Sequence, residues 1–555
     1  MSLCGNNNPC PDLITGQKCG ITYTGARYVP LFADPAEWSN AKTYEPLTIV
    51  IHEGNSYTSK TFVPVGVDIS NKKYWALTGN YNAQVEAYRQ EVLEYINKTN
   101  DLIDKTKYVS NTFNTVADML SANLKQNMVC NTLGYTTSGD GGHNYYVISS
   151  VGTPAIGTVL ELNNGLYAIA VFVNEDVRPQ QFGISSGEQI STSAPKFEAY
   201  INYVNNTDGK YFYFPAGKYY MNKGFYTKKS VIGEECSNSD ITPYLYVDNT
   251  NGVLPIGTGT SSHGIPLNKS AVIGVSEMVM TTPIEIKNFT LMCGTSNDAL
   301  VDYGIYLPDV SKVKLTNLRI GNPEKTGVIG VRAWLLDFNN VNVYGPKLHG
   351  FNIGFQEVIT AAGIATTVNL SNCYVQGGSG TQTGHAYVFL NTHYTTIQNC
   401  ACDVWKNQTG SAYRVIDCDG FSIMNCGTEG CTVNEIVYID QCNAVTVQGV
   451  YALSPTITQG LYRIRGINGS IVLNEMFVGN LSWNTAGSAQ KSYLRCESGS
   501  SGLIDCKLAD FPTIVGGDKT TYYINSNTIT VNIETAASWI VFKNGVRNNV
   551  SLTPA

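Results

Sequence analysis

The chain reads IEIKNFTL at residues 284–291, VKLTNLRI at 313–320, LDFNNVNV at 336–343, VNLSNCYV at 368–375, TTIQNCAC at 395–402, FSIMNCGT at 421–428 and VTVQGVYA at 445–452. Each stretch has Asn or Gly at its fifth position, and the residues two before and one after are apolar or cysteine. Apolar and polar residues alternate, which predicts strands. Consecutive fifth positions are 23 to 32 residues apart. A repeat of that length, built from strands, is typical of a parallel β-solenoid.

The fifth position of each repeat is predicted to be a corner of the coil. Its residues are Asn288, Asn317, Asn340, Asn372, Asn399, Asn425 and Gly449. Asparagine tolerates unusual backbone angles and hydrogen-bonds backbone, so stacked corners are expected to form an asparagine ladder. The next position holds Cys373, Cys400 and Cys426 in three successive repeats, which predicts an inward stack of free thiols. No CxxC pair occurs among the 15 cysteines, and neither a metal nor a cofactor is predicted.

Composition supports a long β structure and excludes several classes of function. Charged residues make up 14% of the 555 residues, against roughly 25% in ordinary domains, while Asn and Gly each number 53. A net charge of −7 argues against a nucleic-acid partner. No apolar run reaches the roughly 18 residues of a membrane span, so no membrane insertion is expected. The N-terminus lacks the pattern of a secretory signal, and synthesis in a cytoplasm is expected.

The N-terminal part divides into short predicted units. Residues 1–26 are predicted to be an extended anchor, and residues 27–78 a small aromatic β module with a hairpin turn at 52–55. This module resembles the carbohydrate-binding modules of chitinases, in which exposed aromatic residues stack on sugars. The resemblance makes Trp38, Tyr57 and Trp75 candidate ligand-binding residues. The alternative is that these aromatics form the core of a domain this small.

Residues 79–112 are predicted to form a coiled-coil helix. Val85, Tyr88, Val92, Tyr95 and Leu102 fall on one heptad seam, which predicts self-association. The alternative is a single helix that packs on its own chain. Beyond it we expect a β-rich neck at 113–178, the parallel β-helix at 179–480 and a separate C-terminal β cap at 481–555.

Three stretches of sequence resemble bacteriophage tailspikes and short-tail appendage proteins. They are EW…TYEPLTIV…GNSYTSK…VPVG…YW…LTGNYNAQVEAYRQEV (37–92), FNTVADML…TLGY…SGDGG…YYVI (113–148) and QFG…YFPAGKYY (181–220). The third is similar to the start of pectate-lyase-like β-helices. The resemblance implies a homotrimer of right-handed parallel β-helices in a virion tail or collar, made in the host cytoplasm. The N-terminus would then bind other phage tail or portal-region proteins, and the C-terminal part would bind host surface polysaccharide.

Acidic residues in the repeat are the candidate catalytic groups. Asp403 and Glu429 lie four residues after successive corners, so adjacent turns are expected to stack them, while Asp417 and Asp419 lie two apart on one strand. His393 is expected to stack against Asp419, and Trp405 and Tyr374 are candidate sugar platforms. Glycoside hydrolysis uses two carboxylates about 5–5.5 Å apart for retention or 6.5–9.5 Å for inversion. The alternative is that these carboxylates are merely solvated.

Three functions fit the sequence. The first is a receptor-binding spike that also depolymerises surface glycan or teichoic acid, as a glycoside hydrolase or a lyase. The second is a non-enzymatic adhesin or structural tail or collar spike whose Asn-, Thr- and Tyr-rich surface binds sugar. The third is a cellular pectate-lyase-like enzyme, against which the heptad and the missing secretion signal argue.

Overall fold

The computed structural model describes residues 17–18, 21–22, 35–79, 81–106, 111–235, 243–247, 256–275, 282–294, 301–354, 364–467, 469–484, 491–497, 501–507, 522–524, 528–534, 541–542 and 550–553. The chain divides into two units, residues 1–108 and 109–555. In the first, β1 (Gln17–Lys18) pairs antiparallel with β2 (Ile21–Thr22). The rest of the predicted anchor, 1–26, lies outside the described residues.

A four-stranded sheet forms the small aromatic module. Its strands are β3 (Ala36–Glu37), β4 (Ile49–His52), β5 (Asn55–Ser59) and β6 (Trp75–Gly79), in that order. The hairpin between β4 and β5 turns at Glu53 and Gly54, both with positive φ, where the sequence predicts it. Positive φ at both central positions is the mark of a type I′ turn, whose backbone twist matches that of the flanking strands. Tyr44, Val50 and Trp75 form the centre of the core.

The helix α1 (Tyr81–Thr106) occupies 26 residues within the predicted helical range. The predicted seam is exposed in the single chain: Val85 is 64% exposed, Tyr88 68%, Val92 55% and Tyr95 60%. The side chain of Leu102 lies outside the described residues. Within the first unit, therefore, these four seam side chains are not buried against other elements.

The second unit begins with a five-stranded sheet, most of which lies in the range 113–178 that the sequence assigns to a neck. Its strands are β7 (Asn111–Phe113), β8 (Val129–Thr132), β9 (Asn144–Ser149), β10 (Val159–Glu161) and β11 (Tyr167–Val171), with α2 (Val116–Ser121) after β7. The carboxylate of Asp140 organises the glycine-rich turn by accepting backbone N–H groups of Tyr135, Thr136, Thr137 and Gly142. These bonds lower the pKa of Asp140 against the opposing effect of burial.

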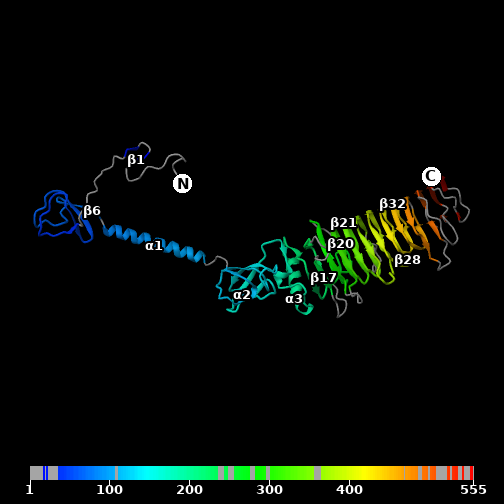
Figure 1. Cartoon of the computed structure of the whole chain (residues 1–555), viewed down its shortest axis with the longest axis horizontal. Helices are drawn as coiled ribbons and strands as arrows, with labels where there is room; N and C mark the ends of the chain where they lie inside the picture. Colours follow the sequence, from blue (N-terminus) through cyan, green and yellow to red (C-terminus); the bar gives the residue numbers. More distant parts are fainter. Residues whose placement is uncertain are drawn as a thin grey trace. The chain divides into compact units, whose positions relative to one another are not determined.

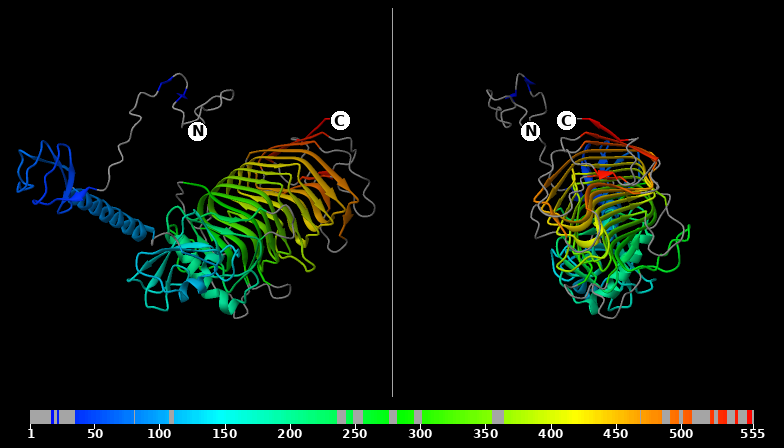
Figure 2. Two further views of the ribbon diagram at one scale, coloured as in Figure 1. Left: turned by 60° about the vertical axis from the view of Figure 1, so that its left-hand side comes forward. Right: turned by 90° about the vertical axis from the view of Figure 1, so that its right-hand side faces the viewer.

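Residues 176–553 form one long parallel sheet that winds into a coil (Figures 1 and 2). Among the described residues its strands are β12 (Asp176–Val177), β13 (Tyr211–Phe214), β14 (Lys218–Met221), β15 (Phe225–Thr227), β16 (Val231–Gly233), β17 (Tyr244–Val247), β18 (Ala271–Val275), β19 (Ile284–Met292), β20 (Tyr303–Gly321), β21 (Thr326–Tyr344), β22 (His349–Ile353), β23 (Ala365–Ser371), β24 (Tyr374–Gln376), β25 (Tyr387–Leu390), β26 (Thr392–Gln398), β27 (Ala401–Asp403), β28 (Lys406–Ile416), β29 (Asp419–Met424), β30 (Gly427–Glu429), β31 (Thr432–Asp440), β32 (Asn443–Leu453), β33 (Thr456–Arg465), β34 (Ser470–Gly479), β35 (Ser482–Trp483), β36 (Ser492–Cys496), β37 (Ser501–Lys507), β38 (Tyr522–Ile524), β39 (Thr528–Glu534), β40 (Val541–Phe542) and β41 (Val550–Thr553). Each strand pairs in parallel with its equivalent one turn later, such as β23 with β26 and β24 with β27. The predicted parallel β-helix is confirmed.

The predicted corner residues do adopt the left-handed conformation. The φ angles are 64° at Asn288, 53° at Asn317, 54° at Asn340, 55° at Asn372, 53° at Asn399, 52° at Asn425 and 64° at Gly449. Part of the expected ladder is present, since Asn317 Nδ2 donates to Asn288 Oδ1 at 3.2 Å and Asn340 Nδ2 to Asn317 Oδ1 at 3.1 Å. The ladder then changes partner, because Asn372 Nδ2 donates to Asn339 Oδ1 instead.

The interior of the coil is a continuous apolar core. Cys373, Cys400 and Cys426 are buried in it as free thiols, as predicted. All eleven cysteines in the described residues are free and buried. Inward aromatic rings also stack from turn to turn, as Tyr387 does on Tyr413 with centroids 5.0 Å apart.

Aromatic side chains close the first turn of the coil. A 3-10 helix η1 (Pro179–Phe182) leads to α3 (Ile190–Asn206), and Phe197 and Tyr200 of α3 are buried in the interior of the coil. The ring of Tyr200 packs edge-on against Phe212 of β13, with centroids 5.3 Å apart. Since α3 covers apolar side chains that no preceding turn covers, it shields the open end of the solenoid.

The C-terminal segment differs from its prediction. The sequence predicts a separate β cap at 481–555, but β36 to β41 continue the parallel ladder of the preceding turns. The repeat signal fades after residue 480 because the asparagine corners and regular spacing are lost, although the strand pairing persists.

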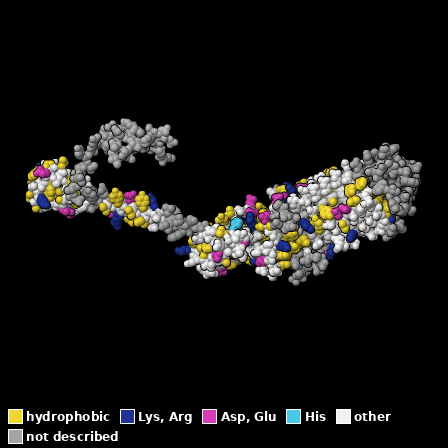
Figure 3. Space-filling view, viewed as in Figure 1, with side chains coloured by type: hydrophobic (Ala, Val, Ile, Leu, Met, Phe, Trp, Pro, Cys, Tyr) yellow, Lys and Arg dark blue, Asp and Glu magenta, His cyan; other side chains and the backbone are white. Residues whose placement is uncertain are grey.

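The surface of the coil is poor in charge. Figure 3 shows uncharged polar side chains and backbone over most of the visible face of the β-helix. None of the described helices is long and apolar enough to cross a membrane.

Candidate active site on the β-helix

Asp403 and Glu429 stand side by side on adjacent turns. They are the last residues of β27 and β30 and are direct register partners in the parallel ladder. The preceding residue of β27, Cys402, is buried, so the alternation of the strand directs Asp403 outward. The backbones of neighbouring strands are about 4.8 Å apart, a spacing that is compatible with the carboxylate separation of retaining glycosidases.

The two carboxylates have different environments. Asp403 is half-buried, and burial raises its pKa above the ordinary value, with the nearby charge of Glu429 acting in the same direction. Glu429 is exposed to solvent. The hydroxyl of Tyr374 donates to Asp403 Oδ2 at 2.9 Å and partly offsets the rise. Burial and this bond to a carboxylate raise the pKa of Tyr374, which therefore remains a proton donor. The raised pKa suits Asp403 to hold a proton and to donate it.

Aromatic residues flank the pair along the same face. One register column runs Tyr374, Ala401, Gly427, Tyr451 and Phe477. Its two small residues lie beside the carboxylates, and its aromatic residues lie on either side of them, with Tyr374 and Tyr451 three turns or about 14 Å apart. The exposed rings of Tyr451 and Phe477 stack in parallel, with centroids 5.2 Å apart.

The other predicted acidic residues lie apart from this pair. Asp419 accepts a hydrogen bond from Asn443 Nδ2 at 2.9 Å and lies 3.2 Å from His393 Nδ1, so the predicted stacking of His393 on Asp419 is present. His393 lies on β26 and Asp419 on β29, and these two strands come before the corner that β27 and β30 follow. Asp417 is an exposed corner residue with a φ of 53°. It is in the same structural position as Asn391 and Gln441, which have the same left-handed conformation.

Two predicted sugar platforms are buried. Trp405 is fully buried, and its indole Nε1 donates to the carbonyl of Gly384 at 3.3 Å. Trp75 is 2% exposed and packs edge-on against Tyr44. The prediction that these two rings stack on sugar was therefore wrong. A small module and a narrow coil each use large rings to fill their interiors. Trp38 and Tyr57 are half-buried at the edge of the module core, and their binding role stays a prediction.

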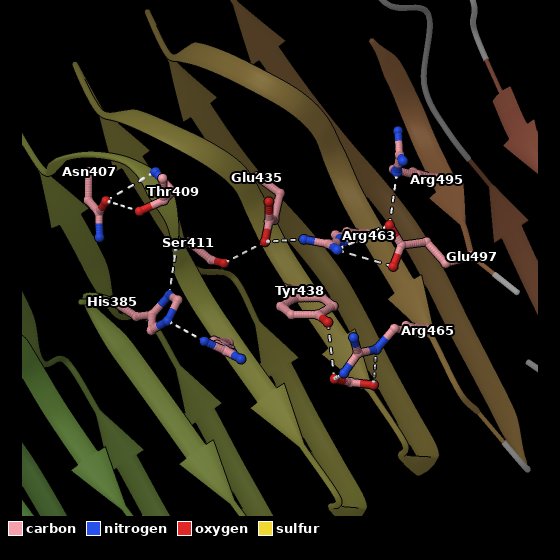
Figure 4. Close-up of polar contacts among 12 residues, drawn as sticks. His385, Asn407, Thr409, Ser411, Glu435, Tyr438, Arg463, Arg465, Arg495 and Glu497 are labelled. Atoms are coloured by element: carbon pink, nitrogen blue, oxygen red, sulfur yellow. Dashed lines mark hydrogen bonds and ion pairs between the residues drawn. The ribbon is translucent and has the colours of Figure 1, made fainter. Parts of the chain in front are cut away.

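A second polar cluster was not predicted (Figure 4). Its guanidinium groups come from Arg414, Arg463, Arg465 and Arg495, its acidic groups are Glu435, Asp440 and Glu497, and Tyr438 lies among them. Arg463 binds Glu497 through two 3.1 Å hydrogen bonds, and the ring of Tyr438 packs between Arg414 and Arg463. The signal was available, because Arg414, Tyr438, Arg463 and Arg495 occupy one register position in four turns of a charge-poor chain.

Glu435 is the most perturbed carboxyl in this cluster. It is 1% exposed, its Oε1 accepts from Ser411 Oγ at 2.8 Å, and its Oε2 is buried with no hydrogen-bond partner among the described residues. Burial raises its pKa to about 7, against the opposing effects of Ser411 and the arginines. With so little exposure it cannot meet a polysaccharide in this conformation, so its effect falls on stability.

Among the described residues, no group of three or more His, Cys, Asp or Glu side chains is arranged so that it could hold a metal ion.

Comparison with known proteins identifies the fold through structure alone. Neither a family model nor a curated protein sequence matches the chain. The gp42 tailspike of Acinetobacter phage vb_AbaP_AS12 is similar with a TM-score of 0.54 and 16% identity, over 77% of this chain and 75% of that one. The tailspike gp49 of Acinetobacter baumannii bacteriophage Fri1, described as a capsular polysaccharide depolymerase, gives a TM-score of 0.41 and 13% identity over 74% and 77%. Tailspike protein 2 of an Escherichia coli O157:H7 bacteriophage gives 0.42 and 12%, over 83% of this chain and 57% of that one. The chain thus has the parallel β-helix fold found in phage tailspikes.

Proposed function

We propose that this chain is a phage tailspike that binds host surface glycan and cleaves it at Asp403 and Glu429. The observation that carries the proposal is the stacked carboxylate pair, flanked by Tyr374 on one side and Tyr451 with Phe477 on the other. Exposed aromatic rings offer apolar faces on which sugar rings can pack.

The chemistry follows from the difference between the two carboxylates. Asp403, with its raised pKa, donates a proton to the oxygen of the leaving sugar. Glu429, exposed and one turn away, attacks the anomeric carbon and forms a glycosyl ester. Water then hydrolyses this ester, with Asp403 acting as base, and the configuration at that carbon is retained.

The experiment incubates the purified full chain with polysaccharides and teichoic acids isolated from bacterial envelopes. We expect release of reducing ends, lost by at least about 100-fold in Asp403→Asn and in Glu429→Gln, because each removes a group that acts on the reacting bond. Asp417→Asn is the matched control, since asparagine also tolerates its left-handed corner, and it should retain full activity.

The adhesin is the second candidate, and the stacked, exposed pair Tyr451 and Phe477 favours it, because such a platform binds sugars without needing any carboxylate. Glycan binding without release of reducing ends, unchanged in Asp403→Asn and lost in Tyr451→Ala, would establish this function and contradict the hydrolase. The assembly proposed with either function is a homotrimer through α1 that attaches to a virion tail or collar through residues 1–26.

A further inference from the structure

A polar hollow of about 600 Å3 lies in the turns that carry the candidate active site. Its walls are the segment before β25 and the first residues of β28, with Thr432 of β31. The side chains that carry the argument are Gln382, Lys406, Asn407 and Thr409. All eight lining residues are polar, and none is acidic or aromatic. The amides, hydroxyls and ammonium group of these walls can hydrogen-bond the hydroxyl groups of a ligand.

The walls of the hollow are fixed by buried amides. Asn407 is 5% exposed; its Nδ2 donates to the carbonyl of Gly384 at 2.6 Å, and its Oδ1 accepts from both the backbone and the hydroxyl of Thr409 (Figure 4). Gln382 is also buried, and its Oε1 accepts from the backbone N–H of Lys406 at 2.7 Å. The β28–β31 register shifts between Asn407 and Ser411, so the strand leaves the ladder at this point. Such irregularities re-aim side chains and are common beside functional sites.

Lys406 gives the hollow an unbalanced positive charge. Its side chain is exposed at the wall, and no acidic side chain in the described part of the chain lies within ion-pairing distance of it. Other described lysines and arginines of the coil contact a carboxylate, as Lys347 and Arg463 do, whereas Lys406 leaves its charge to the hollow. An ammonium group prefers an anionic partner and binds it through charge-assisted hydrogen bonds.

The hollow follows directly on the carboxylate pair. Lys406 is three residues after Asp403, and Thr432 is three residues after Glu429, so the same two turns contribute to both places. Three residues span at most about 11 Å of extended chain. A single oligosaccharide can therefore reach from one place to the other.

We infer that this hollow is a subsite for an anionic sugar unit, carboxylated or phosphorylated, of the glycan held at Asp403 and Glu429. The inference rests on the proposed function, because it extends the same ligand around the corner at Val404 and Trp405. The hydroxyls and amides of the walls bind the sugar hydroxyls, and Lys406 binds the negative charge. Anionic glycans are thus preferred over neutral ones of the same length.

The test measures binding to an array of bacterial surface oligosaccharides with neutral, hexuronate-containing and phosphorylated members, and to carboxyl-reduced copies of the hexuronates. The full-length Asp403→Asn chain serves as the background, so that no glycan is cleaved. We expect Lys406→Gln to weaken binding of anionic members about tenfold, as loss of one charge-assisted hydrogen bond would, and to leave neutral ones unchanged. Carboxyl reduction should have the same effect as the substitution, whereas a response confined to the phosphorylated members identifies phosphate as the anion.

Lys218→Gln is the matched control, because Lys218 is exposed on β14, many turns from the hollow. Equal binding of neutral and anionic members, an unchanged preference in Lys406→Gln, or binding of no anionic member would each overturn the subsite. Failure of the hydrolase is distinguishable from failure of the subsite. A chain that cleaves no glycan can still bind anionic glycans preferentially and lose that preference in Lys406→Gln. Conversely, cleavage that is lost in Glu429→Gln but unchanged in Lys406→Gln would support the hydrolase and contradict the subsite.

Discussion

Single side chains in this coil are tuned by burial more than by charge. With few ionic groups, each buried carboxyl meets a poorly solvating environment that disfavours its charged form. Asp403 and Glu435 both have raised pKa values for this reason, one at the surface and one almost fully buried. Because one lies at the surface and the other in the interior, the raised pKa affects catalysis at Asp403 and stability at Glu435.

At Asp403 the consequence is catalytic. Replacing Tyr374 by Phe removes the hydrogen bond that favours the ionised carboxylate, so the pKa of Asp403 should rise further. If Asp403 is the general acid, the alkaline limb of kcat/KM against pH moves to higher pH. Tyr344→Phe is the control, as its ring packs on Tyr374. A limb that stays in place or moves to lower pH contradicts this role.

At Glu435 the consequence is a pH-dependent stability. Its pKa is raised from 4.5 to about 7 by burial, so the folded chain binds the proton more tightly than the unfolded chain. Stability from this group is therefore complete below pH 4.5 and is lost as pH rises through about 7, by about 3 kcal/mol in all. Glu435→Gln keeps the shape and removes the titration. Between pH 5 and pH 8, the unfolding temperature of the Glu435→Gln variant should rise relative to that of the unaltered chain.

Glu161→Gln is the comparison for this experiment, because Glu161 is exposed on β10. A wild-type stability that rises across the same pH range, or a Gln variant that follows it in parallel, would show that the buried carboxyl is ionised throughout.

At the scale of the elements, the corners determine how strands become a coil. Seven of them hold Asn or Gly at positive φ, and the seventh shows that glycine alone suffices. We therefore expect Asn317→Gly to be nearly neutral apart from the lost hydrogen bonds to Asn288 and Asn340. Asn317→Val should cost about 1–3 kcal/mol more, because a β-branched residue is strained there. Equilibrium unfolding of the two variants checks this, and equal losses would contradict it.

The sequence predicted the elements far better than it predicted their surroundings. The corner and the alternating strand are local patterns, so the repeat gave the β-helix, the thiol stack at Cys373 and the Asp403–Glu429 register. Burial of Trp405 depends on how the corner turns its ring inward, which no local pattern encodes. The cluster around Glu435 joins residues of four turns, and those charges become informative only when the turns are aligned.

At the scale of the whole molecule, the exposed seam of α1 argues that a single chain is incomplete. Val85, Tyr88, Val92 and Tyr95 leave apolar surface in water that a coiled coil would bury. Light scattering of the full chain should give a molecular mass of about three times 60.3 kDa. The double variant Val85→Asp, Val92→Asp should have a lower mass. Glu91→Lys, on another face of the helix, should leave the mass unchanged. A mass of 60.3 kDa for the unaltered chain at micromolar concentration contradicts the trimer.

The parallel pairing of each turn with the next also means that the coil has no intrinsic length. Each turn offers the next open strand edges and inward apolar side chains, so a duplicated or deleted repeat can join its neighbours through the same kind of pairing. Such a change would move everything beyond it by one step of about 4.8 Å. The reach of the molecule can therefore evolve in whole steps while the chemistry at Asp403 and Glu429, confined to two adjacent turns, is carried along intact.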